Sequence, residues 1–177
     1  YYLAILEIDE KDVLFRVGCQ AGTYIRKLCH DIGVKLGCGA HMAELIRTKA
    51  GCFTDKEMWT LQDLSDAYHY WKEEKNEKYV RKMVQPVESA VKHIPKVWVH
   101  DSAISSLTHG RNLAVPGVSK LHNEINPKDI VAVMSLKDEL VALGVAEMSS
   151  VDIMHKENGI ASNIEKVFMI EDLYKRM

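Results

Sequence analysis

The chain has 177 residues, of which 47% are hydrophobic and 27% are charged, and its formal net charge is -2. This length suits one domain or two small ones, and the near-neutral total excludes a protein that is positively charged over its whole surface. The charge is uneven, because residues 11–50 carry seven Lys and Arg against three acidic residues, whereas residues 54–94 carry seven against eight. Positive charge therefore gathers in residues 11–50, as a phosphate-facing surface requires.

Metal and membrane sites are not indicated. The four cysteines are Cys19, Cys29, Cys38 and Cys52. Their spacing contains no CxxC pair, which argues against zinc and favours free thiols in a reducing cytosol. His30 and His41 lie eleven residues apart without a third ligand at a usable spacing. No apolar run approaches the ~20 residues that a membrane span requires, so we expect no membrane partner.

Residues 1–53 predict a hairpin followed by a helix. Residues 1–8 and 13–17 read as two strands joined by a four-residue loop at 9–12. Thr23 is the expected N-cap of the helix, and Gly37-Cys38-Gly39 is its expected end. Five apolar residues form its core-facing stripe: Ile25, Leu28, Cys29, Ile32 and Leu36. A short helix carrying Met42, Leu45 and Ile46 and one extended strand over residues 47–53 are expected next.

Residues 54–94 predict a helical connector. Thr60 is the expected N-cap of a helix with Leu61, Leu64, Tyr68 and Trp71 on one face. Residues 72–78 form a charge-rich break, a second helical stretch follows over residues 79–84, and Pro86 suits the first turn of a renewed helix that reaches Val91. The three tryptophans, Trp59, Trp71 and Trp98, are expected to anchor cores.

Residues 95–172 predict a small β-barrel. A strand is expected at 97–99 and a short helix at 102–107, which Gly110 ends. Strand-like runs follow at 113–115, 130–134, 140–148 and 164–169, and Pro-Gly, Asn-Pro and Asn-Gly pairs separate them. The expected fold class is α+β, a partial mixed-sheet domain with helices followed by a small β pseudo-barrel.

Two groups of residues are candidates for function. Arg26 lies near the N-terminus of the first helix, where a cation gains nothing from the helix dipole. It is either a solvated surface residue or the partner of a carboxylate or phosphate. Tyr24 either packs on the hairpin or stacks on a base. Thr108-His109-Gly110-Arg111 and Lys120 form either a plain helix C-cap with solvated charges or a phosphate-binding turn.

A resemblance to a known family favours the functional alternative for both groups of residues. Residues 22–26 (GTYIR) and 36–45 (LGCGAHMAEL) resemble the later catalytic-domain motifs of the TruB-type pseudouridine synthases. Residues 16–21 (RVGCQA) resemble the dyskerin-type, H/ACA ribonucleoprotein branch. Residues 101–103, 108–110 and 113–118 resemble that branch's PUA domain, an RNA-binding pseudo-barrel. The resemblance covers residues 1–172 and looks archaeal.

The resemblance implies roles for particular residues. Arg26 matches an arginine that pairs with the catalytic aspartate, Tyr24 a tyrosine that lines the uridine pocket, and Leu45 a leucine beneath the target base. A flipped uridine needs such an apolar floor and a fixed charge network. Thr108, His109, Gly110, Arg111 and Lys120 would belong to the RNA-binding surface. No metal or organic cofactor is implied.

The sequence departs from the family pattern in two places. The motif of the HxGTLDP kind that carries the catalytic aspartate is not in this chain, nor is the tyrosine motif after it. We therefore expect this chain by itself to be inactive and to be the later part of a longer enzyme. Many relatives read Glu-Leu-Arg-Arg-Thr where this chain has Glu44-Leu45-Ile46-Arg47-Thr48, so this chain lacks one arginine of the family pattern.

The resemblance predicts the C-terminal portion of an RNA-guided pseudouridine synthase. Residues 1–53 would complete the catalytic domain, 54–94 would form a connector packed on it, and 95–172 would form the PUA domain that grips the ACA end of a guide RNA. The expected partners are guide RNA, substrate rRNA or tRNA, small H/ACA proteins, a kink-turn-binding protein and the missing N-terminal half. The location would be cytoplasmic in an archaeon and nucleolar in a eukaryote. A non-catalytic RNA-binding scaffold and a guide-independent tRNA pseudouridine synthase are the alternatives.

Overall fold

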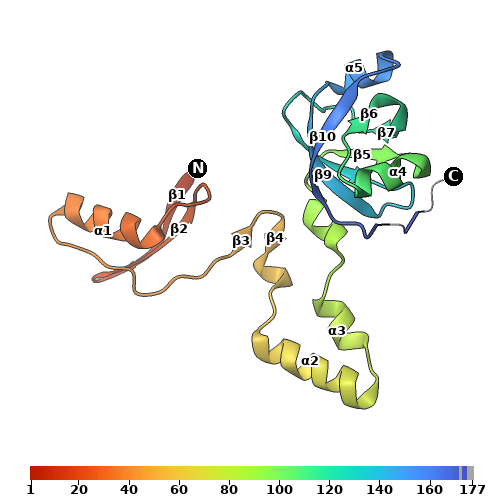
Figure 1. Ribbon diagram of the computed structural model, residues 1–177. Helices are drawn as coiled ribbons and strands as arrows, with labels where there is room; N and C mark the ends of the chain where they lie inside the picture. Colours follow the sequence, from red (N-terminus) through yellow and green to blue (C-terminus); the bar gives the residue numbers. More distant parts are fainter. Residues whose placement is uncertain (172, 175–177) are drawn as a thin grey trace. The chain divides into compact units, whose positions relative to one another are not determined.

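A computed structural model describes residues 1–171, 173 and 174 of the chain (Figure 1). The chain divides into two compact units, Tyr1–Arg47 and Thr48–Met177, which are described separately below. The expected boundary at residue 172 lies outside the described residues. Within the described part of the chain, no helix is long and apolar enough to cross a membrane.

The first unit opens with the predicted hairpin. Strands β1 (Tyr2–Asp9) and β2 (Asp12–Gly18) are antiparallel, with a bulge between Ile5 and Glu7. Asp9 pairs directly with Asp12, so the loop has two residues rather than the four that we predicted. The chain can turn this tightly because Glu10 adopts a positive φ of 49°.

The predicted helix follows as α1 (Ile25–Leu36). It ends as expected at Gly37, whose φ of 75° is left-handed. Its N-cap is Tyr24 rather than Thr23, and no side chain caps it. The apolar stripe is buried at Cys29, but Leu36 at its far end is 72% exposed.

The segment after α1 differs from the prediction. Residues 38–48 form no helix. In place of one extended strand, β3 (Lys49–Ala50) and β4 (Phe53–Thr54) form a short antiparallel hairpin. The left-handed Gly51, with a φ of 59°, reverses the chain between them.

The connector is helical as predicted. A 3₁₀ turn η1 (Asp55–Glu57) precedes α2 (Leu61–Glu74), α3 (Lys78–Met83) and a second 3₁₀ turn η2 (Val87–Val91). Thr60 caps α2 in a reciprocal arrangement, because the Asp63 N–H donates to its hydroxyl and the Thr60 N–H donates to the Asp63 carboxylate. Pro86 is the N-cap of η2 and does not lie inside a helix. The expected apolar face of α2 is exposed, and Trp59 and Trp71 are each about 40% exposed rather than core anchors.

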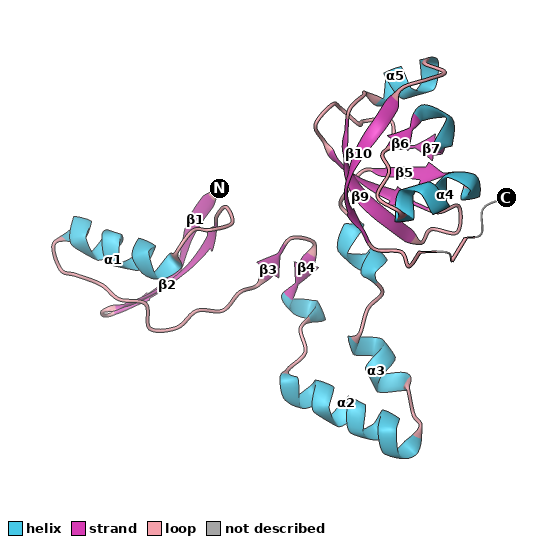
Figure 2. Cartoon of the chain, viewed as in Figure 1, coloured by secondary structure: helices cyan, strands magenta, loops and turns pink. Residues whose placement is uncertain are grey.

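The rest of the second unit is a curved six-stranded sheet with two short helices (Figure 2). The strand order is β6-β10-β9-β8-β5-β7. Strands β5 and β8 are parallel, and the other neighbours are antiparallel. The elements are β5 (Lys96–Val99), α4 (Asp101–Thr108), β6 (Leu113–Ala114), η3 (Val115–Gly117), β7 (Val118–Leu121), β8 (Ile130–Met134), β9 (Leu140–Ala146), α5 (Ser150–His155) and β10 (Ile160–Val167).

The core of the sheet is built mainly from the predicted strands. The side chains of Val97, Val99, Val131, Val133 and Val141 are at most 1% exposed and pack into one cluster. These valines lie in the runs that the sequence marked as strands. Strand β7 and helix α5 were not predicted, because β7 exposes Ser119 and Lys120 and α5 is only six residues long. The α+β class is confirmed.

Candidate RNA interface

The start of α1 carries two of the predicted site residues. Tyr24 precedes the helix in an extended conformation, and its side chain is 80% exposed. Arg26 is the second helical residue and is exposed. No ion pair to Arg26 occurs among residues 1–171, 173 and 174. Both side chains are therefore available to a ligand.

Leu45 belongs to the irregular segment that returns past α1. Its side chain is 54% exposed. The Gly39 N–H donates to the Gly33 carbonyl over 3.0 Å and ties the start of this segment to the helix. A Cβ atom on Gly33 would collide with the backbone of Gly39 and Ala40, so the close approach requires glycine at residue 33. The structure thus places Leu45 in the same compact unit as Tyr24 and Arg26.

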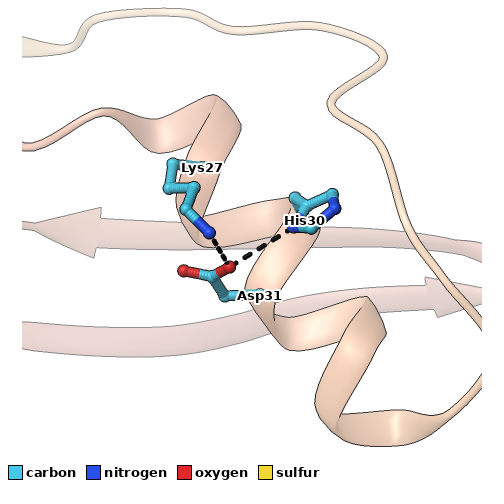
Figure 3. A network of polar contacts seen from close by, with 3 residues as sticks. All are labelled: Lys27, His30 and Asp31. Carbon is cyan, nitrogen blue, oxygen red and sulfur yellow. Dashed lines mark hydrogen bonds and ion pairs between the residues drawn. The ribbon is translucent and has the colours of Figure 1, made fainter.

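A polar network on the same helix neutralises the neighbouring charges. The Asp31 carboxylate accepts a hydrogen bond from the Lys27 ammonium, and His30 Nδ1 lies 3.3 Å from the same Asp31 oxygen (Figure 3). The hydrogen bond from Lys27, and then that from His30, lower the pKa of Asp31. The charge of Lys27 is therefore matched by Asp31, whereas that of Arg26 is not.

The turn after α4 has two parts with different accessibility. The Thr108 side chain is 6% exposed, and its hydroxyl donates to the Ser105 carbonyl over 3.0 Å. His109 Nδ1 lies 2.7 Å from the same carbonyl oxygen. Gly110 has a φ of 77°, and the Arg111 N–H then donates to the Ser106 carbonyl. Hydrogen bonds to the carbonyls of α4 therefore hold the turn in place, and the guanidinium of Arg111 is exposed.

Lys120 lies on β7, directly opposite Trp98 on β5. Its ammonium sits 4.4 Å from the centroid of the Trp98 ring, in a cation–π contact. The Trp98 indole N–H donates to the Asp138 carboxylate over 2.6 Å, which fixes the ring. Sequence reasoning selected Lys120 but missed this partner, because only the pairing of β5 with β7 aligns the two residues. Among the residues that the structure describes, no group of three or more His, Cys, Asp or Glu could hold a metal ion.

The comparisons with known proteins agree with this arrangement. Residues 26–92 match the family model of the tRNA pseudouridylate synthase B C-terminal domain, and residues 95–168 match that of the PUA domain. The chain is 58% identical over its whole length to the "Probable tRNA pseudouridine synthase B" of Thermococcus onnurineus. The chain carries the C-terminal domain of TruB-type pseudouridine synthases, followed by a PUA domain. It spans about half of the curated relatives that it matches, 53% in the case of the Thermococcus protein.

Chains in solved H/ACA complexes match both units. A chain in the crystal structure of the archaeal box H/ACA sRNP Nop10-Cbf5 complex is 56% identical, with a TM-score of 0.93, over 100% of this chain and 58% of that one. A chain in the structure of an H/ACA RNP bound to a substrate RNA containing 2'-deoxyuridine is also 56% identical, with a TM-score of 0.92, over 99% and 56%. The family predicted from residues 16–26, 36–45 and 101–118 is confirmed.

Proposed function

We propose that this chain is the C-terminal portion of an RNA-guided pseudouridine synthase, which isomerises uridine to pseudouridine in rRNA or tRNA. The observation that carries the proposal is the match of both units, at 56% identity, to chains in two solved H/ACA complexes, one of them archaeal. Residues 1–53 would complete the catalytic domain, 54–94 would connect it, and 95–172 would form the PUA domain.

The first unit supplies supporting groups for catalysis. Arg26 is an exposed cation without an ion pair in the described chain, as a residue that pairs with a catalytic carboxylate in another segment must be. Tyr24 would face the flipped uridine, and Leu45 would form the apolar floor beneath the base. The catalytic aspartate would come from the N-terminal half, so the activity belongs to the complete protein.

The second unit supplies the guide-binding surface. Arg111 and Lys120 would contact phosphates, which position an RNA without reading its sequence. The left-handed Gly110 lets the backbone of the turn approach the ligand closely. The internal hydrogen bond of Thr108 holds this turn rigid. The ACA end of the guide RNA would bind here, mainly through shape and phosphate contacts.

The partners follow from the same proposal. The chain would act with guide RNA, substrate RNA, small H/ACA proteins that dock on the catalytic domain, and a kink-turn-binding protein, in the cytoplasm of an archaeon. A requirement for guide RNA separates this function from that of a guide-independent tRNA pseudouridine synthase. Turnover by the complete protein without a guide would favour the latter.

Binding to guide RNA tests the proposal. The affinity of this chain for an H/ACA guide is compared with that for the same RNA with a scrambled ACA trinucleotide, over a series of salt concentrations. We expect a clear preference for ACA. Arg111→Ala should weaken binding and reduce the slope of log K against log salt by about 0.7–0.9, the effect of one phosphate contact. Arg111→Lys, which keeps the charge, should keep the slope. Equal affinity for both RNAs would contradict the assignment of the ACA-binding role.

A further inference from the structure

The outer face of the β5–β7 pair differs in chemistry from its inner face. Side chains alternate along a strand, and Val97, Val99 and Leu121 point into the barrel core. The residues between them lie on the opposite face, where the half-buried Trp98 also packs against a second apolar cluster. We call this set the outer basic face: Lys96, Trp98, Lys120 and His122.

Contacts within the outer basic face hold it in one arrangement. The His122 N–H donates to the Lys96 carbonyl over 3.0 Å, and the Lys96 N–H donates to His122 Nδ1 over 3.3 Å. The His122 ring meets the Trp98 ring edge to face, with the centroids 5.2 Å apart. Together with the Lys120 ammonium above the indole, these contacts fix three side chains before any ligand arrives.

The hydrogen bonding of His122 leaves one donor free for a ligand. Because Nδ1 accepts from the backbone, the neutral ring carries its proton on Nε2. His122 also lines a surface depression of about 530 Å³. The other lining residues are Lys92, His93, Ile94, Pro95, Leu121, Asn123 and Glu124.

The charges around this depression suit an anion. Lys92 lines it, and the Lys96 ammonium donates to the carbonyls of Lys92 and Ile94 at its rim. Glu124 is the acidic residue in the lining. The carboxylate of Asp138, at the other end of the outer basic face, is engaged by the Trp98 indole N–H. Lysines at 92, 96 and 120 therefore surround the His122 ring, whose Nε2–H is the ring donor left for a ligand.

We propose that the outer basic face and the depression beside it bind single-stranded RNA, as a site additional to the turn at residues 108–111. Ammonium groups interleaved with aromatic rings are the combination that contacts phosphates and stacks on unpaired bases. The inference rests on the proposed function in taking RNA as the ligand. It adds Lys92, Lys96 and His122 to the contact surface, and it extends that surface from Lys120 toward the connector.

The test measures binding of the whole chain to a fluorescent oligouridine by anisotropy, over a series of salt concentrations. Lys92→Gln combined with Lys96→Gln removes two phosphate contacts. Each phosphate contact on a single strand contributes about 0.7 to the slope of log K against log salt, so the slope should fall by about 1.4. The affinity at ~0.1 M salt should then fall about 25-fold. His122→Ala, which leaves both lysines in place, should weaken binding at least about fivefold through lost stacking.

Two matched controls accompany these variants. Lys92→Arg with Lys96→Arg keeps both charges and should keep the slope. Lys156→Gln with Lys166→Gln removes two exposed lysines elsewhere, one directly after α5 and one on β10, and should also leave the slope unchanged. Thermal unfolding checks that each variant is folded. An equal loss in the Lys156 and Lys166 pair would overturn the proposal, because binding would then follow total charge.

Two further outcomes separate this inference from its rivals. Labelled polyglutamate that binds as tightly as oligouridine, and is weakened equally by the Lys92 and Lys96 changes, would assign the face to acidic peptides and overturn the proposal. The chain could keep its preference for guide RNA with an intact ACA while the variants of the outer basic face leave its affinity for oligouridine unchanged. That result would remove this inference alone. Loss of ACA preference with face-dependent oligouridine binding would instead remove only the ACA-binding role.

Discussion

Gly33 is the position where a single methyl group should separate two parts of the candidate catalytic site. In an exposed helix, Gly→Ala stabilises by about 1 kcal/mol, because alanine has the higher helix propensity. At residue 33 the added Cβ would collide with the backbone of Gly39 and Ala40. Overpacking of this kind costs about 1–3 kcal/mol. Displacement of the segment would also break the hydrogen bond from Gly39 to Gly33, which is worth about 1 kcal/mol.

The three contributions give a net local destabilisation of about 1–3 kcal/mol for Gly33→Ala. Amide hydrogen exchange is the suitable assay, because it reports local opening rather than unfolding of the whole chain. The Gly39 amide should exchange roughly 5- to 150-fold faster, since each 1.4 kcal/mol is a factor of ten. Val34→Ala, at the adjacent position that is 61% exposed, is the control and should leave exchange unchanged or slower. Slower exchange of α1 in Gly33→Ala would refute the reasoning, because helix propensity would then outweigh the contact.

Three other predictions concern catalysis, the connector and the barrel. Arg26→Ala in the reconstituted complete enzyme should abolish turnover while RNA binding changes little, because the arginine acts beside developing charge; near-normal turnover would remove its assigned role. Thr60→Ala should destabilise α2 by about 1 kcal/mol, seen as faster exchange of its first-turn amides. The Tyr174 hydroxyl and then Ser135 lower the pKa of Glu139 by hydrogen bonding, so this carboxylate stabilises the fold above its usual pKa of 4.5, and the contribution is lost as pH falls through the lower folded value. Tyr174→Phe should raise that pKa in an NMR titration, and an unchanged value would show that the hydroxyl does not act on Glu139.

The sequence by itself determined the elements whose signals are local. Strand β5, strand β8 and helix α4 lie close to where apolar runs and turn residues placed them, and Thr60 caps α2 as its neighbours predict. The family also followed from short motifs, because the residues that carry the resemblance are contiguous in the chain. Signals of this kind depend on residues within a few positions of one another.

Only the tertiary structure decided the features that depend on distant residues. Residues 42–46 pattern as a short helix, yet they are irregular, in a segment whose start at Gly39 and Ala40 lies close to Gly33. Strand β7 has too few apolar residues to be recognised, and it is a strand because β5 pairs with it. The same pairing places Lys120 over Trp98 and His122 beside it. Contacts between residues more than 20 positions apart leave no period in the sequence, so the outer basic face became visible only once the two strands were aligned.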